Sequence, residues 1–291
     1  MKTLLHLVLL PAALLVASSE VRAQTVQVVG SNFVGEALKL NSKLDHKAGD
    51  YSVTYKMTGS LVGSLKLKEG LADVAFVLQS PDELDLEGLK AIPLGFWGIY
   101  FAVQEENPMS EIKEDELSEI LRKTRDGLKS EWGSLLPSEP KWTNRLIFVT
   151  FDILESDPSF PILVNQFFDN EMPEKFGAMG ERIENPYLAS ASNLVVMSKL
   201  PDPNRGLRSL SWISTGSGVG YPPSPESLFY GDYPLRLPLY LIVRDSVDPK
   251  VKAYIRNFFS SDQLEILKES GFVPVPDNLQ KQALLEFDLE I

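Results

Sequence analysis

The stretch YSVTYKMTGSLVGSLKLKEGLADVAFVL, residues 51–78, decides the fold. Residues 51–55 alternate apolar and polar side chains, which predicts a strand. Residues 58–63 are typical of a turn, and residues 64–70 predict a short helix that ends at a glycine. Residues 73–78 then form an apolar run that predicts a buried strand. The order strand, turn, helix, strand is typical of an α/β sheet.

The segment before this stretch has the same order. Residues 25–29 are rich in valine and predict a strand, which ends at Gly30-Ser31-Asn32. Apolar residues between Phe33 and Leu44 follow near-helical spacing, and Ser31 or Asn32 is a natural N-cap. The start of such a helix leaves backbone N–H groups unpaired. Two successive strand–turn–helix units therefore predict an α/β sheet with both turns at one edge.

The remaining chain continues with mixed elements. We expect an amphipathic surface helix over 111–125, a strand over 146–150 and a second amphipathic helix over 251–267. Residues 91–103 form a long apolar and aromatic stretch. Residues 201–234 are rich in proline, glycine and serine and predict an irregular surface path.

The N-terminus predicts export. Lys2 precedes an apolar run over residues 4–17, and Val21-Arg22-Ala23 places small residues where signal peptidase cleaves. We expect residues 1–23 to be a signal peptide and Gln24 to begin a periplasmic or secreted protein. A run of about 14 apolar residues is too short to span a bilayer, which needs about 20, and no later stretch is long and apolar enough.

Composition excludes several function classes. The chain has 28 basic and 40 acidic residues, a net charge of −12, so it repels nucleic acid and anionic lipid surfaces. It has no cysteine, which excludes thiolate chemistry and disulfides. Outside the signal segment the only histidine is His46, expected to be solvated in a helix end and turn over 43–50. No cofactor, no metal site and no enzymatic activity are expected.

Several short motifs occur in the order that one family uses. They are Thr58–Gly63 followed by Asp73-Val74-Ala75, then Asn107-Pro108, Tyr233-Pro234-Leu235 and Gly271-Phe272-Val273-Pro274. Together with the Gly-Ser turn after the first strand, they resemble the phosphate-binding protein of bacterial ABC transporters. The wider family is that of the type II periplasmic binding proteins, and the resemblance covers most of the chain after the signal.

The resemblance implies two α/β lobes joined by two crossover strands, with a ligand cleft between them. The first lobe would hold residues 24–102 plus 235–291, and the second lobe residues 103–234. Hinge closure around a bound ligand would be the working motion. The implied partners are a small anion such as phosphate and a membrane ABC transporter or another envelope protein, with a role in phosphate transport.

The resemblance also implies the ligand-binding positions. Residue by residue, they are Ser31, Asn32, Phe33, Gly59, Ser60 and Ser156. Hydroxyl groups and backbone N–H groups at helix starts suit a small oxyanion. Gly59-Ser60 is equally typical of a plain turn with an N-cap.

The sequence departs from the family pattern at the same site. Leu61 replaces a middle glycine, and Leu78 stands where the family carries a carboxylate. The loop over 152–158 has no arginine, and Asp152, Glu155 and Asp157 would repel phosphate. We therefore expect a solute-binding protein for phosphate, another small oxyanion or an altered ligand. The alternative is a ligand-free interaction or scaffold module of the cell envelope with a degenerate cleft.

Overall fold

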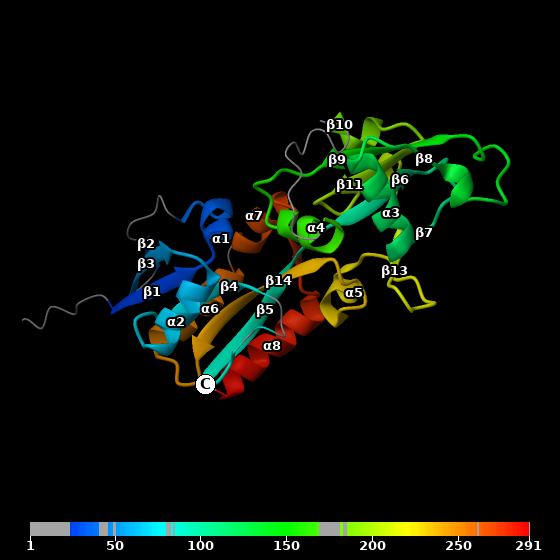
Figure 1. Ribbon diagram of the computed structural model, residues 1–291. Helices are drawn as coiled ribbons and strands as arrows, with labels where there is room; N and C mark the ends of the chain where they lie inside the picture. The colour runs from blue at the N-terminus through cyan, green and yellow to red at the C-terminus, as the bar shows by residue number, and fades with distance from the viewer. Residues whose placement is uncertain are drawn as a thin grey trace, which may run out of the picture.

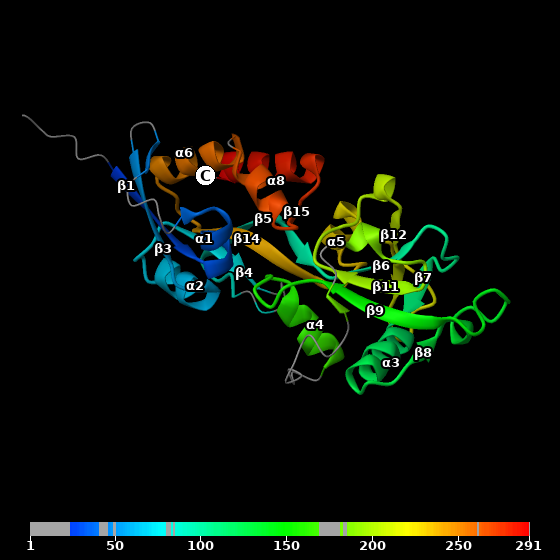
Figure 2. The same ribbon diagram turned by 90° about the horizontal axis from the view of Figure 1, so that it is seen from above.

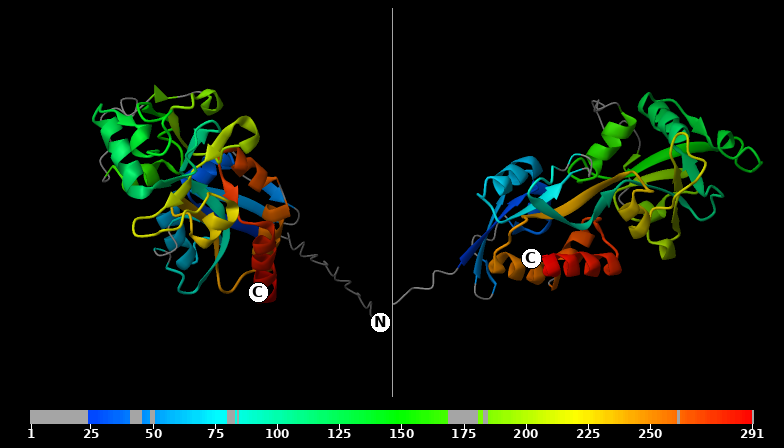
Figure 3. Two further views of the ribbon diagram at one scale, coloured as in Figure 1. Left: turned by 90° about the vertical axis from the view of Figure 1, so that its right-hand side faces the viewer. Right: turned by 90° about the horizontal axis from the view of Figure 1, so that it is seen from below.

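The computed structural model describes residues 24–40, 46–48, 51–79, 83, 85–168, 181–182, 185–260 and 262–290. The expected signal peptide, residues 1–23, lies outside the described residues. Two separate sheets lie end to end in an elongated molecule (Figures 1 and 3). We call residues 24–98 and 236–290, as far as they are described, the first unit, and residues 100–235, as far as they are described, the second unit.

The first unit is built on a seven-stranded mixed sheet in the described part of the chain. β1 (Gln24–Gly30) runs parallel to β3 (Tyr51–Met57) and to β4 (Val74–Leu78), so the carboxyl ends of these strands share one edge. β14 (Arg236–Arg244) lies antiparallel between β4 and β5 (Leu89–Gly98). The sheet is completed by β2 (His46–Ala48) and β15 (Val273–Pro274), and its order is β15-β5-β14-β4-β1-β3-β2.

Helices cover both faces of this sheet (Figure 2). α2 (Ser60–Lys68) packs on one face, where its buried Leu67 joins a small cluster with Val29 and Ala75. The opposite face carries α1 (Asn32–Ala37), α6 (Pro249–Ser260) and α7 (Gln263–Glu269), whose apolar side chains form a larger core with the sheet. The C-terminal α8 (Asp277–Glu290) packs against β5.

The second unit contains a sheet ordered β10-β9-β11-β6-β12, with β8 added beside β9. These strands are β6 (Tyr100–Gln104), β8 (Ser130–Glu131), β9 (Leu146–Asp152), β10 (Glu181–Arg182), β11 (Asn193–Met197) and β12 (Leu207–Ser209). A separate ladder joins β7 (Glu111–Lys113) to β13 (Ser211–Ile213). The helices are α3 (Glu114–Arg125), α4 (Phe160–Phe167) and, towards the first unit, α5 (Pro225–Tyr230). A core rich in aromatic side chains holds this unit together.

The chain passes between the units at two adjacent points. β5 ends at Gly98, and the N–H of Ile99 donates to the carbonyl of Leu235 (3.0 Å), just before β14 begins. The phenol of Tyr233 donates to the carbonyl of Ile99 (2.7 Å) and its ring stacks on Tyr100 (6.0 Å). The predicted lobe boundaries at residues 102 and 235 remain predictions. Pairing with the second sheet begins at Tyr100, where β6 starts, so β6 belongs wholly to that sheet.

The structure corrects four local expectations. Residues 111–113 of the helix expected over 111–125 form strand β7. α2 begins at Ser60, where the sequence predicted a turn over 58–63 and a helix over 64–70. His46–Ala48 form strand β2, paired antiparallel with β3, where the sequence favoured a helix end and turn. The helix expected over 251–267 is two helices, α6 and α7. The apolar spacing continues across the break because both helices bury residues in the same core, which periodicity alone does not separate.

Candidate functional site

The turn after β1 needs glycine. Gly30 has φ +127°, and a Cβ atom there would lie 2.1 Å from the carbonyl oxygen of Phe76 on β4. The N–H of Ser31, a buried residue at the start of α1, donates to the same carbonyl (2.8 Å). Ser31 therefore offers its hydroxyl alone. The N–H groups of Asn32 and Phe33 have no hydrogen-bond acceptor among the described residues.

The turn after β3 positions a second helix start. Gly59 has φ +100° and precedes Ser60, the first residue of α2. The Ser60 hydroxyl accepts a hydrogen bond from the N–H of Leu78 at the end of β4 (3.0 Å), so its proton points elsewhere. The first N–H groups of α2 lie at the positive end of a nine-residue helix.

These two turns are tied together. The N–H of Gly59 donates to the carbonyl of Gly30 (2.8 Å), and a Cβ atom on Gly63 would lie 2.8 Å from the Gly30 Cα. The carboxyl ends of β1, β3 and β4 meet here, where ligands bind in open α/β sheets. We call this region, residues 30–33 with 59 and 60, the junction edge. It brings together Ser31, Asn32, Phe33, Gly59 and Ser60, five of the six predicted ligand-binding residues.

The sixth predicted residue, Ser156, lies in the second unit. It is exposed in the loop between β9 and α4, residues 153–159, which we call the Asp157 loop. The loop is closed by its own aspartate: the Asp157 carboxylate accepts hydrogen bonds from the Leu154 N–H (2.7 Å) and the Ser198 hydroxyl (3.0 Å). In Figures 1 and 2 this loop lies on the side of the second unit turned toward the first unit.

The start of α4 has few amides to offer a ligand. The N–H of Phe160 donates to the Asp157 carbonyl (3.0 Å), Pro161 has no N–H, and the N–H of Ile162 donates to the Ser159 carbonyl (3.0 Å). The Ser159 hydroxyl is buried with no hydrogen-bond partner among the described residues. This helix start therefore differs from the junction edge, because its amides are already satisfied within the chain.

A cavity of about 240 Å³ lies between the units. Ser270 at the end of α7 lines it from the first unit, and the second unit contributes the Asp157 loop and the residues after β11. The full lining is Asp152, Ile153, Leu154, Asp157, Ser198, Lys199 and Ser270. Its volume is below the roughly 300–1,000 Å³ of pockets for drug-sized ligands, so it suits a small solute.

Sequence reasoning missed most of this cavity. None of the six predicted residues lines it. Ser198 and Lys199 follow β11 in a stretch without a recognisable motif, and Ser270 lies just before the Gly271–Pro274 motif but outside it. The sequence did identify the acidic character of the Asp157 loop, but not that Asp157 folds back on the loop N–H.

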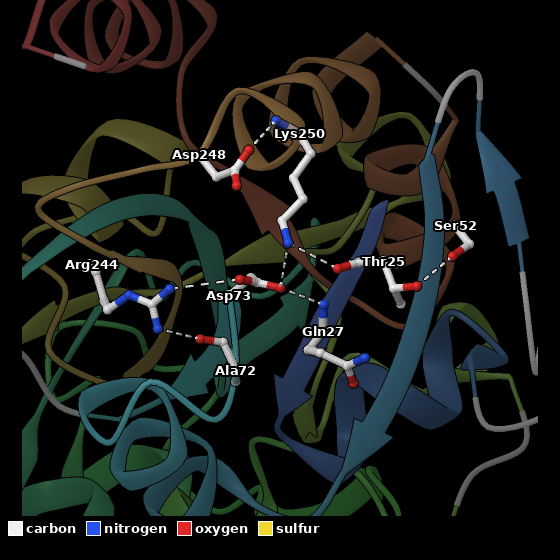
Figure 4. A network of polar contacts seen from close by, with 8 residues as sticks. All are labelled: Thr25, Gln27, Ser52, Ala72, Asp73, Arg244, Asp248 and Lys250. Atoms are coloured by element: carbon white, nitrogen blue, oxygen red, sulfur yellow. Dashed lines mark hydrogen bonds and ion pairs between the residues drawn. The ribbon is translucent and has the colours of Figure 1, made fainter. Parts of the chain in front are cut away.

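The opposite edge of the first sheet carries a polar network of a different kind (Figure 4). The Asp73 carboxylate accepts a hydrogen bond from the Gln27 N–H (2.8 Å) and lies 3.6 Å from Arg244 and 3.8 Å from Lys250. Lys250 also donates to the Thr25 carbonyl (3.1 Å). Asp73 thus joins β1, β4, β14 and α6 at the amino ends of the parallel strands, away from the junction edge.

The described residues contain no group of three or more histidine, aspartate or glutamate side chains placed to hold a metal ion. Within the same residues, no helix combines the length and apolar character that crossing a membrane requires.

Comparisons with known proteins place the fold. No protein-family model matches the sequence, and no curated protein matches it. Among solved structures, a possible phosphate binding protein from Planctomyces limnophilus is similar over 92% of this chain and 99% of its own, with TM-score 0.62 and 15% identity. PstS from Borrelia burgdorferi covers 87% and 99%, with TM-score 0.55 and 18% identity.

A third similar structure is an ABC-type phosphate transport receptor from Vibrio cholerae. It covers 85% of this chain and 99% of its own, with TM-score 0.51 and 16% identity. The expected structural similarity to phosphate-binding periplasmic proteins is confirmed over most of the chain, and at these identities it concerns the fold. The chain has the mixed α/β fold of the type II periplasmic binding proteins, as its resemblance to that family implied.

Proposed function

We propose that this protein is an exported solute-binding protein that holds a small solute between its two units, for delivery to a membrane transporter. The junction edge would bind an anionic group of the solute. The ligand would be phosphate, another small oxyanion, or a small solute that joins an anionic group to a second polar group. Ser156 and the Asp157 loop would face that solute from the second unit.

One observation carries this proposal: the turns at Ser31 and Ser60 are hydrogen-bonded to each other at one sheet edge. They leave the N–H groups of Asn32 and Phe33 and the proton of the Ser60 hydroxyl for a ligand. Such donors, at the start of helices, stabilise negative charge without a cationic side chain. This suits a chain with a net charge of −12, whose overall field does not attract anions.

The test combines thermal unfolding with calorimetry. The probes are phosphate, sulfate, molybdate, and small solutes in which one phosphate, phosphonate or carboxylate is joined to an amine. We expect at least one probe to raise the melting temperature, because a ligand that binds only the folded state stabilises it. Asn32→Asp should weaken that ligand by about tenfold or more, since it places a carboxylate beside the donors.

The matched control is Asn278→Asp. Asn278 is also an exposed asparagine in the first turn of a helix, α8, and lies outside the junction edge. It should leave the affinity unchanged. Binding that both variants weaken equally, or no binding by any probe, would remove the proposal.

The second candidate function is a ligand-free interaction module of the cell envelope. It is favoured by the Asp157 loop, whose donors are satisfied internally and which contains no arginine. This function predicts a melting temperature unchanged by every probe. It also predicts a stable complex with one envelope protein that forms without added solute and survives Asn32→Asp.

A further inference from the structure

The carboxylate of Asp157 is hydrogen-bonded to donors of the second unit. It accepts two hydrogen bonds, from the Leu154 N–H (2.7 Å) and the Ser198 hydroxyl (3.0 Å). One backbone N–H and one hydroxyl are the donors that proteins commonly offer to phosphate and sulfate. Here both converge on a side chain that already carries the negative charge, so an incoming oxyanion meets an occupied pair of donors.

The surrounding loop does not replace these donors. The Asp157 N–H donates to the Leu154 carbonyl (2.9 Å), and the N–H groups of Phe160 and Ile162 donate within the same turn. Pro161, the second residue of α4, has no N–H. An oxyanion at this end of the cavity would therefore gain few hydrogen bonds while facing the Asp157 carboxylate.

The charges that line the cavity reinforce this. Asp152 and Asp157 contribute two carboxylates, and Lys199 is the one cationic side chain in the lining. The Lys199 ammonium donates to the carbonyl of Glu269 at the end of α7 (2.7 Å), where the helix dipole is negative. Lys199 thus bridges the units, and the other charged side chains of the lining are both carboxylates.

We propose that Asp157 determines ligand specificity by acting as an internal anion that excludes free oxyanions from the second-unit side of the cavity. This rests on the proposed function, because it assumes that the solute lies between the units. A ligand that fits this wall presents a hydrogen-bond donor to it, and keeps its anionic group at the junction edge.

The experiment compares phosphate and sulfate binding by the full mature chain and its variants, using calorimetry at fixed ionic strength. Asp157→Asn removes the charge and keeps an oxygen that can accept from Leu154. Asp157→Ala frees both donors. We expect both variants to bind phosphate at least about tenfold more tightly than the unmodified protein, which corresponds to about 1.4 kcal/mol.

Asp248→Asn is the matched control. The Asp248 carboxylate also accepts a backbone N–H two residues ahead, from Lys250 (3.1 Å), and this substitution removes the same charge at the amino edge of the first sheet (Figure 4). It should leave phosphate affinity unchanged. If the gain in the Asp157 variants came only from the lower net charge, Asp248→Asn would show it too, and the proposal would be overturned.

The double variant Asp157→Asn with Asn32→Asp locates the gained site. Loss of the gain supports binding between the units, and an undiminished gain overturns the proposal. Unchanged phosphate affinity in both Asp157 variants, with thermal unfolding showing them folded, also overturns it. Failure of this proposal can be distinguished from failure of the proposed function. The proposed function fails when no probe binds the unmodified protein, or when Asn32→Asp does not weaken the binding of any probe.

Discussion

The two units start a helix from the end of a strand in opposite ways. At the junction edge the backbone forms the turns: Gly30 and Gly59 take positive φ, and the turns hydrogen-bond to each other. The N–H groups of Asn32 and Phe33 have no acceptor among the described residues. In the Asp157 loop a side chain closes the turn: the Asp157 carboxylate accepts hydrogen bonds from the Leu154 N–H and the Ser198 hydroxyl. A strand-to-helix turn can therefore offer donors to an anion only where no side chain of the protein already satisfies them.

The largest expected effect tests how the junction edge is built. Gly30→Ala should lower the free energy of unfolding by about 3 kcal/mol or more, because the new Cβ atom meets the backbone of Phe76 at positive φ. Urea unfolding measures this. Gly59→Ala is the control: Gly59 also has positive φ, but no atom lies within 4 Å of its Cβ position, so about 1–2 kcal/mol is expected. Equal losses would contradict a steric origin.

A smaller effect is expected at the opposite sheet edge. Asp73→Asn should cost about 2 kcal/mol, because it weakens a charged hydrogen bond to Gln27 and leaves Arg244 and Lys250 without their carboxylate. Urea unfolding at low and high salt is the measurement, and the loss should shrink at high salt. Asp85→Asn, at an exposed pair with Lys68, should leave stability unchanged. Phosphate affinity should not respond to either variant, which separates the two edges of the sheet.

Ser60→Ala should cost about 1 kcal/mol, since the Leu78 N–H loses its acceptor. Ser60→Ala should also lower the affinity for any ligand that binds less tightly to Asn32→Asp, because the junction edge loses one donor. Ser64→Ala in the same helix is the control: Ser64 donates only to the Ser60 carbonyl within α2, so little change is expected in either measurement. A Ser60→Ala protein with normal stability would show that Leu78 finds another acceptor.

The smallest effect concerns the border between the units. The Tyr100 hydroxyl is buried with no partner among the described residues, so Tyr100→Phe should change stability at pH 7 by less than about 1 kcal/mol. Burial raises the pKa of Tyr100, so the folded state keeps its proton while the unfolded state loses it near pH 10. Stability should therefore fall as pH rises above about 10, and less steeply in Tyr100→Phe. Identical alkaline unfolding curves for both proteins would refute this.

The junction edge could be predicted from the sequence because it depends on local order. Two strand–turn–helix units place their turns at one edge of a parallel pair, and Ser31 and Ser60 do meet there. Neither periodicity nor turn chemistry indicates that the Ser31 N–H is taken by Phe76, a contact between residues 45 positions apart. The sequence placed the start of the first helix correctly and the start of the second four residues late, at 64 where α2 begins at Ser60, and it did not show which N–H groups are already bonded.

The second unit was less predictable for the same reason. The carboxylates of the Asp157 loop were evident, but whether Asp157 faces solvent or its own loop depends on Ser198, which follows β11 and is 41 positions away in the sequence. The cavity also needs Ser270 from the first unit. Such sites are assembled from side chains far apart in the sequence, and only the three-dimensional arrangement identifies them.

The position of β14 has a consequence for the order of folding. β14 lies between β4 and β5, so the sheet of the first unit is closed by a strand that is synthesised after the entire second unit. Until residues 236–244 have been synthesised, β4 and β5 lack the strand that lies between them. All the strands of the second sheet have been synthesised by then. The sheet of the first unit, although it holds the N-terminal strands, is therefore completed only after every strand of the second sheet has been synthesised.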